Sequence, residues 1–427
     1  MAGQVYTGSA WSEAATRGRS VGAILGFISS SGSVTNVVWG QAAPDTTAAW
    51  SKTNPVVGVA PPGTAYVELG VLAYGTDQGE THYLDTASIT THASGSTNLI
   101  GPLHTTGNKI EDANNQIVTP RGVNSDWLDW NSSIWAGTPL DDNSVAHMKQ
   151  WGANVVRVLL SENFWNSKDC LYAPGYAAAV DQAVQSITSR GMVAMLDLHN
   201  NGRTSCDNHV SNQQRMADSP GSVDFWKSVA SRYKNNPLVA FDLYNEPHDI
   251  TWAVWRNGGQ LTDSDGVTWQ AAGMQQLYNA VRGRGAHNLI FVSGDNWANT
   301  PPPATSLLSG SNIVYAAHYY TCPQAPPPSC TTPNPYDPTP VLNQWTTLAG
   351  RLPVMLTEFG WPDPASGTYN QNVINWAESK GIGWTPYVWA QGGAAGTTSA
   401  FGYLADQNVF EPAASGMPVL AGLARNS

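Results

Sequence analysis

The chain has 427 residues, of which 41% are hydrophobic and 12% are charged, and its formal net charge is −11. This length favours one large domain accompanied by a smaller one. The hydrophobic share is too high for a disordered chain, and the sequence has no apolar run of about 18 residues that would predict a membrane span. An acidic chain without a basic cluster offers no electrostatic attraction to nucleic acid or to an anionic membrane.

Tryptophan and tyrosine are abundant, with 18 and 16 copies. Rings on a weakly charged background suit flat, neutral, polyhydroxylated ligands whose C–H faces stack on them, although a large aromatic core explains the same composition. The surface is poor in Lys and rich in Ser, Thr and Asn, which is typical of a secreted, extracellular protein. Because no signal peptide follows Met1, we expect a processed or recombinant form.

The four cysteines agree with export. Cys322 and Cys330 bracket the irregular stretch CPQAPPPSC, which a disulfide would hold together. Cys170 and Cys206 follow two successive predicted strands, so the two loops could meet. We therefore expect two disulfides, with buried thiols as the alternative.

The first part of the chain consists of short strand-like runs broken by Gly, Pro and Asn, such as SVGAILGFI, TNVVWG and TAYVELGVLAYG. No helical period is sustained there, which predicts a small all-β sandwich over residues 1–91. Small polar residues without periodicity then predict a linker over residues 92–98. The remaining chain, residues 99–427, follows a different pattern.

This larger part begins with a predicted hairpin, IEDANNQIV, whose Asn-Asn turn would close the base of the domain. Apolar runs then alternate with amphipathic stretches. The expected strands are TPRGVN, NVVRVLL, MVAMLDLHN, LVAFDLYNEP, LIFVSGDNW, IVYAAHYY, LPVMLTEFG and GWTPYVW. Helices are expected over GYAAAVDQAVQSITSRG, SVDFWKSVASRYKN and WQAAGMQQLYNAVRGRG. Eight such units predict an α/β fold, a (β/α)8 TIM barrel; an open doubly wound sheet is the alternative, but the Gly-rich phosphate loop common in that fold is missing.

The active site of such a barrel lies at the C-terminal ends of its strands. In this sequence those ends carry polar and aromatic side chains that a buried strand would not need: Asn124, Arg157, His199, Asn200, Asn245, Glu246, Trp297, His318, Tyr320, Glu358 and Trp389. Each buried polar group costs free energy unless it is paired, so their coincidence at one end of the barrel predicts a functional site.

Glu246 and Glu358 end the fourth and seventh strands and would face one another across the barrel mouth. Two carboxyl groups about 5 Å apart suit hydrolysis of a glycosidic bond with retention of configuration: one donates a proton and the other attacks the anomeric carbon. We expect Arg157 to keep Glu358 charged and Asn245 to donate to the sugar 2-OH. His318 and Tyr320 would orient the two carboxyl groups. The alternative is that both Glu side chains are ordinary ion-pair partners.

From about Leu103 onward the chain resembles glycoside hydrolase family 5, the cellulase-like group of retaining barrels. The resemblance rests on RGVN, NVVRV, LDLHN, LYNEPH, AHYY, LTEFG and YVW, in family order. It implies that Glu246 is the acid/base and Glu358 the nucleophile, with no cofactor and no metal. The supporting and substrate-binding positions implied are Asn245, Arg157, His199, Asn200, His318, Tyr320, Trp389 and Trp297. The stretch from YNEPH to NAVR is most similar to bacterial endoglucanases, which implies a monomer acting on β-1,4-glucan. Mannan, xyloglucan, β-1,3-glucan or a short exo-substrate remain alternatives.

The N-terminal segment resembles part of a family 4/9/22-type carbohydrate-binding jelly roll, through SAWSEAATRGRSVGAILGF and PPGTAYVELGVLAYGTDQGETHYLDTASI. About 90 residues are few for such a module, so this copy is expected to be truncated. Trp11, Trp39 and Trp50 could form a stacking platform or fill the core, and we favour the core. Whether Asp85 helps to hold calcium is left open.

Other reactions on a barrel fit less well. A Schiff-base aldolase needs a Lys at a strand end, and none of the eight ends has one. A metal-dependent barrel hydrolase would carry His-x-His on the first strand, where Gly122, Val123 and Asn124 stand. The match of GRSVG to a nucleophile elbow precedes an apolar run instead of joining a strand to a helix. A catalytically silent glycan-binding protein remains the alternative from a different functional class.

Overall fold

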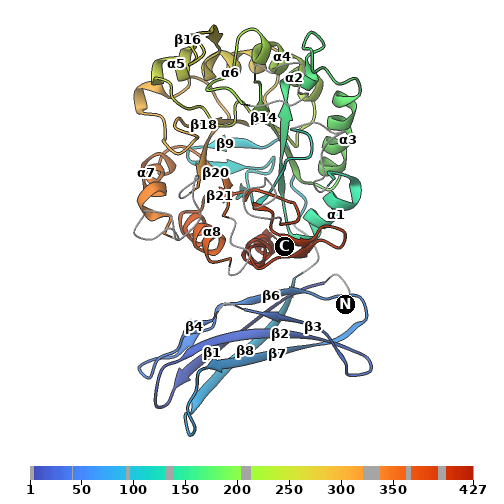
Figure 1. Cartoon of the computed structure of the whole chain (residues 1–427), viewed down its shortest axis with the longest axis vertical. Helices are drawn as coiled ribbons and strands as arrows, with labels where there is room; N and C mark the ends of the chain where they lie inside the picture. The colour runs from blue at the N-terminus through green and yellow to red at the C-terminus, as the bar shows by residue number, and fades with distance from the viewer. Residues whose placement is uncertain are drawn as a thin grey trace. The chain divides into compact units, whose positions relative to one another are not determined.

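The computed structural model describes residues 4–40, 42–92, 97–129, 139–202, 213–320, 337–361, 367–392 and 401–426. The chain divides into two compact units (Figure 1). Unit 1 comprises residues 1–96, 149–152 and 417–427, and unit 2 comprises residues 97–148 and 153–416.

Unit 1 contains two antiparallel sheets. Sheet A contains β1 (Val5–Ala14), β5 (Ser51–Lys52), β6 (Val56–Val59) and β8 (His82–His92). Sheet B contains β2 (Ser20–Ser29), β3 (Val34–Trp39), β4 (Ala43–Pro44) and β7 (Thr64–Tyr74). Alternate residues of β1 and β2 point inward, and the core is formed by Tyr6, Ala23, Leu25, Phe27, Val56 and Ala60. The predicted all-β architecture of this segment is therefore confirmed.

The three tryptophans expected in this core lie outside it. Trp11, Trp39 and Trp50 are 37%, 58% and 40% exposed, so the expectation that they fill the sandwich is wrong. The register explains the outcome for two of them: Trp11 lies opposite Lys52 and Trp39 opposite Ile24, on the outward faces of sheets A and B. Strand alternation therefore directs both rings away from the core.

Unit 2 is built on eight parallel strands, which confirms the predicted TIM-like barrel (Figure 1). In sheet order they are β12 (Gly122–Ser125), β13 (Val155–Ser161), β14 (Val193–Asn200), β15 (Val239–Asp242), β18 (Ile290–Ser293), β19 (Ile313–Tyr319), β20 (Val354–Phe359) and β21 (Gly383–Trp384). A parallel bridge between Arg121 and Trp384 brings the first and last strands together. The barrel is thus nearly closed.

Helices surround the strands in Figure 1. The helices of the described residues are α1 (Asp142–Trp151), α2 (Glu162–Trp165), α3 (Tyr176–Thr188), α4 (Gly221–Tyr233), α5 (Trp252–Asn257), α6 (Met274–Arg282), α7 (Thr339–Ala349), α8 (Thr368–Lys380) and α9 (Met417–Leu423), with short 3₁₀ turns at Ala304–Ser306 and Ala424–Asn426. In this part of the chain, no helix is long and apolar enough to cross a bilayer.

One predicted helix begins later than expected. Residues 269–271 belong to β17 (Thr268–Ala271), which pairs with β16 (Gly259–Thr262), and α6 starts only at Met274. Gly273 lies between the end of β17 and the start of α6. A Cβ at this position would lie 2.2 Å from the backbone nitrogen of Gly258, so the close approach of the two backbones requires glycine here. A further pair, β22 (Leu404–Asp406) and β23 (Glu411–Pro412), lies near the end of unit 2.

The base of the barrel is closed by the predicted hairpin. β10 (Lys109–Glu111) pairs with β11 (Ile117–Val118) and with β9 (His104–Thr106). Its Ile110 joins a cluster of buried residues from the strands: Val155, Val193, Met195, Leu238, Ala240, Leu289, Phe291, Val314 and Met355, together with Leu103. This apolar cluster fills the barrel interior below the polar strand ends.

Cys170 is disulfide-bonded. Cys206, Cys322 and Cys330 lie outside the described residues, so both predicted pairings stay predictions.

Candidate active site

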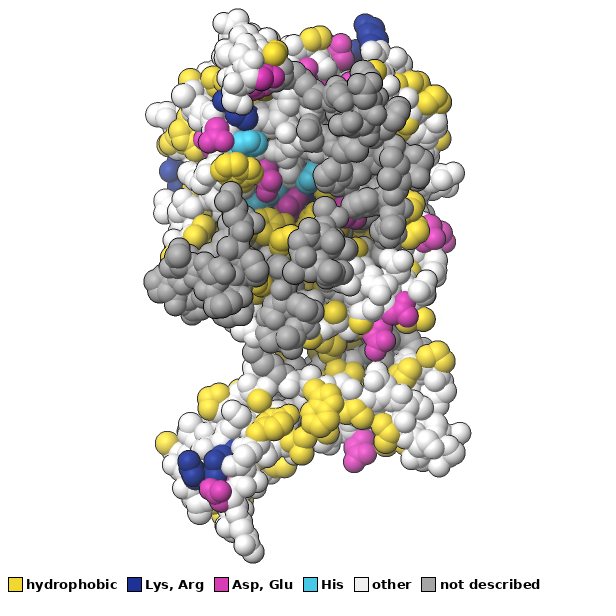
Figure 2. Space-filling model, in the orientation of Figure 1, with side chains coloured by type: hydrophobic (Ala, Val, Ile, Leu, Met, Phe, Trp, Pro, Cys, Tyr) yellow, Lys and Arg dark blue, Asp and Glu magenta, His cyan; other side chains and the backbone are white. Residues whose placement is uncertain are grey.

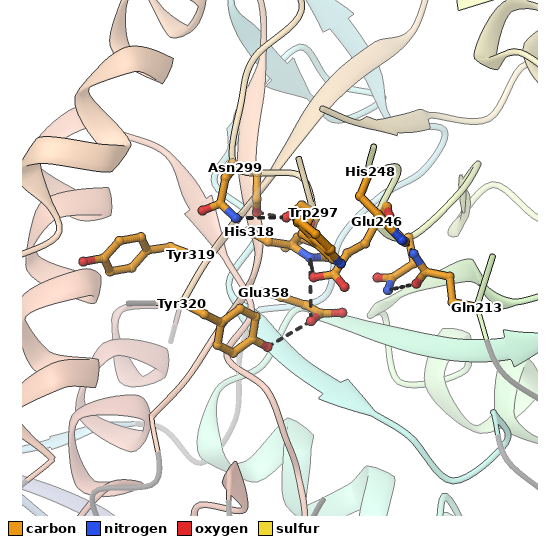
Figure 3. A network of polar contacts seen from close by, with 12 residues as sticks. Gln213, Glu246, His248, Trp297, Asn299, His318, Tyr319, Tyr320 and Glu358 are labelled. Carbon is orange, nitrogen blue, oxygen red and sulfur yellow. Dashed lines mark hydrogen bonds and ion pairs between the residues drawn. The ribbon is translucent and has the colours of Figure 1, made fainter. Parts of the chain in front are cut away.

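Glu246 and Glu358 meet at the C-terminal ends of the barrel strands (Figure 3). Glu358 lies on β20, whereas Glu246 lies four residues after the end of β15 at Asp242. Together with a ring nitrogen of His318, a carboxylate oxygen of each lies within 4.8 Å of the others. Figure 2 shows acidic and histidine side chains in a hollow on the visible face of unit 2. The 4.8 Å limit on the distance between the carboxylate oxygens of Glu246 and Glu358 is close to the separation of about 5–5.5 Å in retaining glycosidases.

Glu358 is buried and receives a hydrogen bond on each oxygen. Nη1 of Arg157 donates to Oε1 at 2.5 Å, and the hydroxyl of Tyr320 donates to Oε2 at 2.9 Å. Burial, and then the charge of Glu358, raises the pKa of Tyr320 well above its usual value, so this hydroxyl keeps its proton and remains a donor. Both donors stabilise the ionised form of Glu358, as a nucleophile requires.

Arg157 is completely buried on β13 and is held on three sides. Nε donates to Asp242 at 2.9 Å, Nη2 lies 3.0 Å from Asp197, and Nη2 also donates to Oδ1 of Asn245 at 2.8 Å. Burial opposes the positive charge, but the nearby carboxylates outweigh it and raise the pKa of Arg157 above its usual value. The guanidinium is therefore fixed against Glu358 by groups on two further strands.

Glu246 has a different environment. Its Oε1 lies 2.8 Å from Nδ1 of His318, which is also 3.7 Å from Oε2 of Glu358. Burial raises the pKa of Glu246, and burial lowers the pKa of His318 to about 3, so this imidazole is neutral at ordinary pH. Among the described residues, no Lys or Arg contacts Glu246, in contrast to Glu358. The pair is chemically asymmetric: burial raises the pKa of Glu246, whereas Glu358 receives hydrogen bonds from Arg157 and Tyr320.

The amide of Asn245 is oriented by its neighbours. Its Oδ1 accepts from Arg157, so Nδ2 points to the other side, where it donates to Oε1 of Gln213 at 2.7 Å and lies 3.4 Å from Nε2 of His199. Nδ1 of His199 lies 2.8 Å from Oδ2 of Asp197, and burial lowers the pKa of His199 to about 4. A neutral His199 therefore donates from Nδ1 to Asp197 and offers an acceptor to the amide.

Three predicted substrate contacts differ in their access to the pocket. The side chain of Asn200 is buried and donates to the backbone oxygen of Asp129 at 3.1 Å, so it supports the loop after β12 instead of facing the cleft. Trp389 is 1% exposed, and its Nε1 donates to Oγ of Ser144 at 2.9 Å, which leaves almost none of its ring for a ligand. Trp297 is 43% exposed and stacks on His248 with ring centroids 4.5 Å apart.

Tyr387 is the aromatic residue of the last strand end that approaches the two carboxyl groups. Its side chain is half-buried, and burial together with Asp126, Asp129, Glu358 and Glu246 raises the pKa of Tyr387 well above its usual value. Of the two rings, Tyr387 keeps exposed surface, whereas Trp389, the predicted substrate contact, is buried.

Sequence reasoning also missed four buried acids and one amide around the pair: Asp126, Asp129, Asp197, Asp242 and Gln213. Asp197 and Asp242 stand in LDLHN and FDLYNEP, where strand alternation was the available signal. Burial raises the pKa of both to about 7 although Arg157 lowers it. Both oxygens of Asp129 are buried, and neither has a hydrogen-bond partner among the described residues.

Glu246, His318 and Glu358 are also the one group of three potential metal ligands found within the described ranges. The two oxygens of Glu358 already receive Arg157 and Tyr320. Asp85 is not in the group, and its Oδ1 accepts from the backbone nitrogen of Thr86 at 2.6 Å.

Two tryptophans of the short helices that follow β13 and β15 are packing residues. Trp165 and Trp255 are buried, and their indole nitrogens donate to Ser228 and to the backbone oxygen of Ser293.

Comparison with known proteins agrees with this geometry. The sequence profile of the family described as Cellulase (glycosyl hydrolase family 5) matches residues 111–393. An endoglucanase of Halalkalibacter akibai is 25% identical over 294 residues, which are 63% of this chain and 34% of the relative. A probable endo-beta-1,4-glucanase B of Neosartorya fischeri is 30% identical over 185 residues, 42% of this chain and 51% of the relative. The matches thus span one third to one half of these curated relatives.

Solved structures share the fold. A beta-glucanase of Saccharophagus degradans in complex with cellotetraose has a TM-score of 0.59 at 21% identity, over 78% of this chain and 95% of its own. The catalytic domain of a Thermobifida fusca endoglucanase has a TM-score of 0.52 at 19% identity, over 76% and 97%.

Proposed function

This chain belongs to glycosyl hydrolase family 5, and from that premise we propose that it is an endoglucanase that cleaves β-1,4-glucan with retention of configuration. The observation that carries the proposal is the approach of Glu246 and Glu358 within 4.8 Å, with two hydrogen-bond donors on Glu358 and none of the described cations in contact with Glu246.

In the first step, a carboxylate oxygen of Glu358 attacks the anomeric carbon, and the bond from that carbon to the glycosidic oxygen breaks. Glu246 gives its proton to the departing oxygen, so the leaving chain departs as an alcohol. Arg157 and Tyr320 must release part of their hold on Glu358 as its charge passes into the new ester bond. Their hydrogen bonds also fix the direction of attack.

In the second step, water attacks the same carbon from the face that the leaving chain vacated. Glu246, now ionised, takes the proton of this water, and the ester bond to Glu358 breaks. His318 suits this alternation, because its Nδ1 lies 2.8 Å from Oε1 of Glu246 and its ring stays neutral in both steps. Asn245 would contact the 2-OH of the sugar after its Nδ2 exchanges Gln213 for substrate.

The choice of β-1,4-glucan rests on the printed names of the relatives and on cellotetraose in two neighbouring structures. Mannan, xyloglucan and β-1,3-glucan would use the same two carboxyl groups, because the preference lies in the loops. Trp297 and Tyr387 are the exposed or half-buried rings that we assign to sugar stacking.

The decisive experiment incubates the chain with carboxymethylcellulose, glucomannan, xyloglucan and laminarin, and follows reducing ends and product anomers by NMR. The proposal expects the highest rate and a fall in viscosity on carboxymethylcellulose, with β-configured products appearing first. Preference for another polymer would change the substrate, and α-configured first products would overturn retention. Absence of hydrolysis on every polymer would favour a silent glycan-binding protein.

Several further properties are part of the proposal. We infer a secreted monomer without cofactor or metal, with disulfides joining Cys170 to Cys206 and Cys322 to Cys330. The domain boundaries that we propose are 1–91 for the sandwich, 92–98 for a linker and 99–427 for the catalytic barrel. The sandwich would serve as a carbohydrate-binding module.

A further inference from the structure

We propose that the outward face of sheet A carries a second glucan-binding site, formed by Trp11, Tyr83 and Trp50. The first two rings belong to adjacent strands, and Trp50 directly precedes β5. Tyr83 is 53% exposed, and the two tryptophans are 37% and 40% exposed. The choice of glucan as ligand rests on the proposed function of the barrel, whereas the site itself rests on unit 1 alone.

The strand register places Trp11 and Tyr83 on one face. Trp11 lies opposite Asp85 of β8, and Glu13 lies opposite Tyr83. Residues 11 and 13 of β1 point to the same side, so the rings of Trp11 and Tyr83 are diagonal neighbours about 7–8 Å apart at the backbone, within reach of one extended ligand. On the other edge of β1, Trp11 lies opposite Lys52.

Hydrogen-bonding groups surround the rings. Lys52, Asp85 and Glu13 share this face with Trp11 and Tyr83. One oxygen of Asp85 already accepts from the backbone nitrogen of Thr86 at 2.6 Å. Both charge signs occur close together, so the face has no strong net charge. It would not favour an anionic or a cationic partner over a neutral one.

This chemistry matches a neutral, polyhydroxylated chain. Aromatic faces contact the C–H surfaces of pyranose rings, while carboxylates and an ammonium group pair with the hydroxyl groups around the ring edge. Adjacent strands are about 4.8 Å apart, which is similar to the length of one glucose unit in an extended chain. A glucan running across β5, β1 and β8 would therefore present successive sugars to successive strands.

Only part of the outward face of sheet A is exposed and could contact a ligand. Val5 and Val57, which share it near β6, are buried, and Ser9 is buried as well. The exposed part of this face begins at Trp11 and extends to Tyr83, and Trp50, which directly precedes β5, is exposed as well. The proposed site is therefore the end of sheet A that lies away from β6.

Sheet B provides an internal contrast. Its outward face also exposes rings, Trp39 and Tyr66, but their cross-strand partners Ile24 and Ile28 are aliphatic. Among the paired residues of β2, β3 and β7, the one charged side chain is that of Glu68, which lies opposite Gly26. Figure 2 shows hydrophobic side chains gathered on the visible face of unit 1. A face with so few hydrogen-bonding groups offers little to sugar hydroxyls, although its aromatic exposure is similar.

The test measures binding of the full chain to insoluble cellulose, and its retardation in gels that contain hydroxyethylcellulose. The catalytic variant Glu358→Gln is used as the background, so that the polymer is not consumed. We expect the pair Trp11→Ala and Tyr83→Ala to weaken binding by about tenfold or more. The matched control pair, Trp39→Ala and Tyr66→Ala on sheet B, should change binding by less than about twofold.

A single exposed substitution, Tyr83→Ser, guards against misfolding of the Trp11 variant, and it should weaken binding by about threefold or more with an unchanged unfolding temperature. In the background with Glu358 intact, the sheet A variants should hydrolyse soluble cello-oligosaccharides normally. Loss of binding only in the sheet B variants, equal loss in both, or no loss in either would overturn the site.

The two proposals fail separately. Absence of hydrolysis with binding that still depends on Trp11 and Tyr83 would count against the catalytic proposal and for this site. Gels made with glucomannan or laminarin identify the ligand: retention that depends on sheet A in those gels, but not in hydroxyethylcellulose, would overturn the choice of β-1,4-glucan.

Discussion

Nη1 of Arg157 lies 2.5 Å from Oε1 of Glu358, and both side chains are buried at the open end of the barrel. This contact distinguishes the two candidate catalytic acids. Glu358 has a permanent cation within hydrogen-bond distance, whereas Glu246 contacts the neutral ring of His318. The difference in charge supports the proposal that Glu358 attacks and that Glu246 transfers the proton.

Replacing Glu358 with Gln should lower kcat by roughly 10⁴-fold or more, because a carboxamide cannot form the glycosyl ester. The substitution preserves shape and removes a buried charge, so circular dichroism should still report a folded protein. Turnover of carboxymethylcellulose is the measurement. Activity within about tenfold of the parent would refute the assignment of the nucleophile.

Replacing Glu246 with Ala removes the proton donor and opens space beside the anomeric carbon. Hydrolysis of an aryl glycoside with a good leaving group should then be rescued in part by azide and yield a β-glycosyl azide, since azide replaces water in the second step. Burial raises the pKa of Glu246, so the parent enzyme should lose activity as pH rises through that pKa and the acid becomes ionised. This alkaline loss should be absent in the variant with the activated substrate, and an α-azide product would indicate inversion.

Replacing Tyr320 with Phe removes one of the two donors on Glu358, at 2.9 Å from Oε2. A hydrogen bond to a charged group contributes about 1.5–3 kcal/mol, so kcat should fall about 10- to 100-fold. Tyr319→Phe is the matched control, because its hydroxyl donates to the backbone of Asp337 and points away from the carboxyl pair (Figure 3). Equal effects of the two substitutions would show that Tyr320 acts through folding alone.

The strand ends were predictable because two simple regularities act together. Parallel strands of a barrel all end at one rim, and a buried polar residue there costs free energy unless it is paired, so a cluster of such residues indicates a functional site. These two regularities predict from the sequence that Glu246, Glu358, Arg157 and His318 lie at the same rim.

Other residues could not be placed this way. Tyr387 and Trp389 are two residues apart, so strand alternation would point both side chains in the same direction. Because β21 already ends at Trp384, the sequence does not say which ring faces the pocket. Packing against Ser144 and Phe410 buries Trp389, and those contacts join parts of the chain more than 20 residues away. Likewise, strand alternation predicts which residues share a sheet face with Trp11 or Trp39, but it does not predict which face packs against the core.

Asp126 provides a test of pH-dependent stability. It is buried after β12, and burial raises its pKa to about 7 from the usual 3.8. The folded protein therefore binds this proton more tightly than the unfolded chain, so the contribution of Asp126 to the free energy of unfolding is greatest below about pH 4 and is lost as pH rises to about 7, by up to about 4 kcal/mol. Asp126→Asn should unfold at a higher temperature than the parent at pH 8 and show little difference at pH 4. A parent that is more stable than the variant at pH 8 would mean that Asp126 is ionised and paired.

Asp197 links two parts of the site that sequence reasoning treated separately. Its Oδ1 lies 3.0 Å from Nη2 of Arg157, and its Oδ2 lies 2.8 Å from Nδ1 of His199. In Asp197→Asn, the amide would present a donor to one of these two donors, so either Arg157 shifts from Glu358 or His199 changes its tautomer.

We expect kcat of Asp197→Asn to fall about 10- to 100-fold with a smaller change in KM, because the loss affects the charge and direction of Glu358 more than ground-state binding. Asp242→Asn is the matched control: Asp242 accepts from Nε of Arg157 and has no contact with His199 among the described residues. If the contact between Asp197 and His199 affects catalysis, the acid limb of the pH profile of kcat should move in Asp197→Asn and not in Asp242→Asn. Identical pH profiles and identical losses in the two variants would limit Asp197 to holding Arg157.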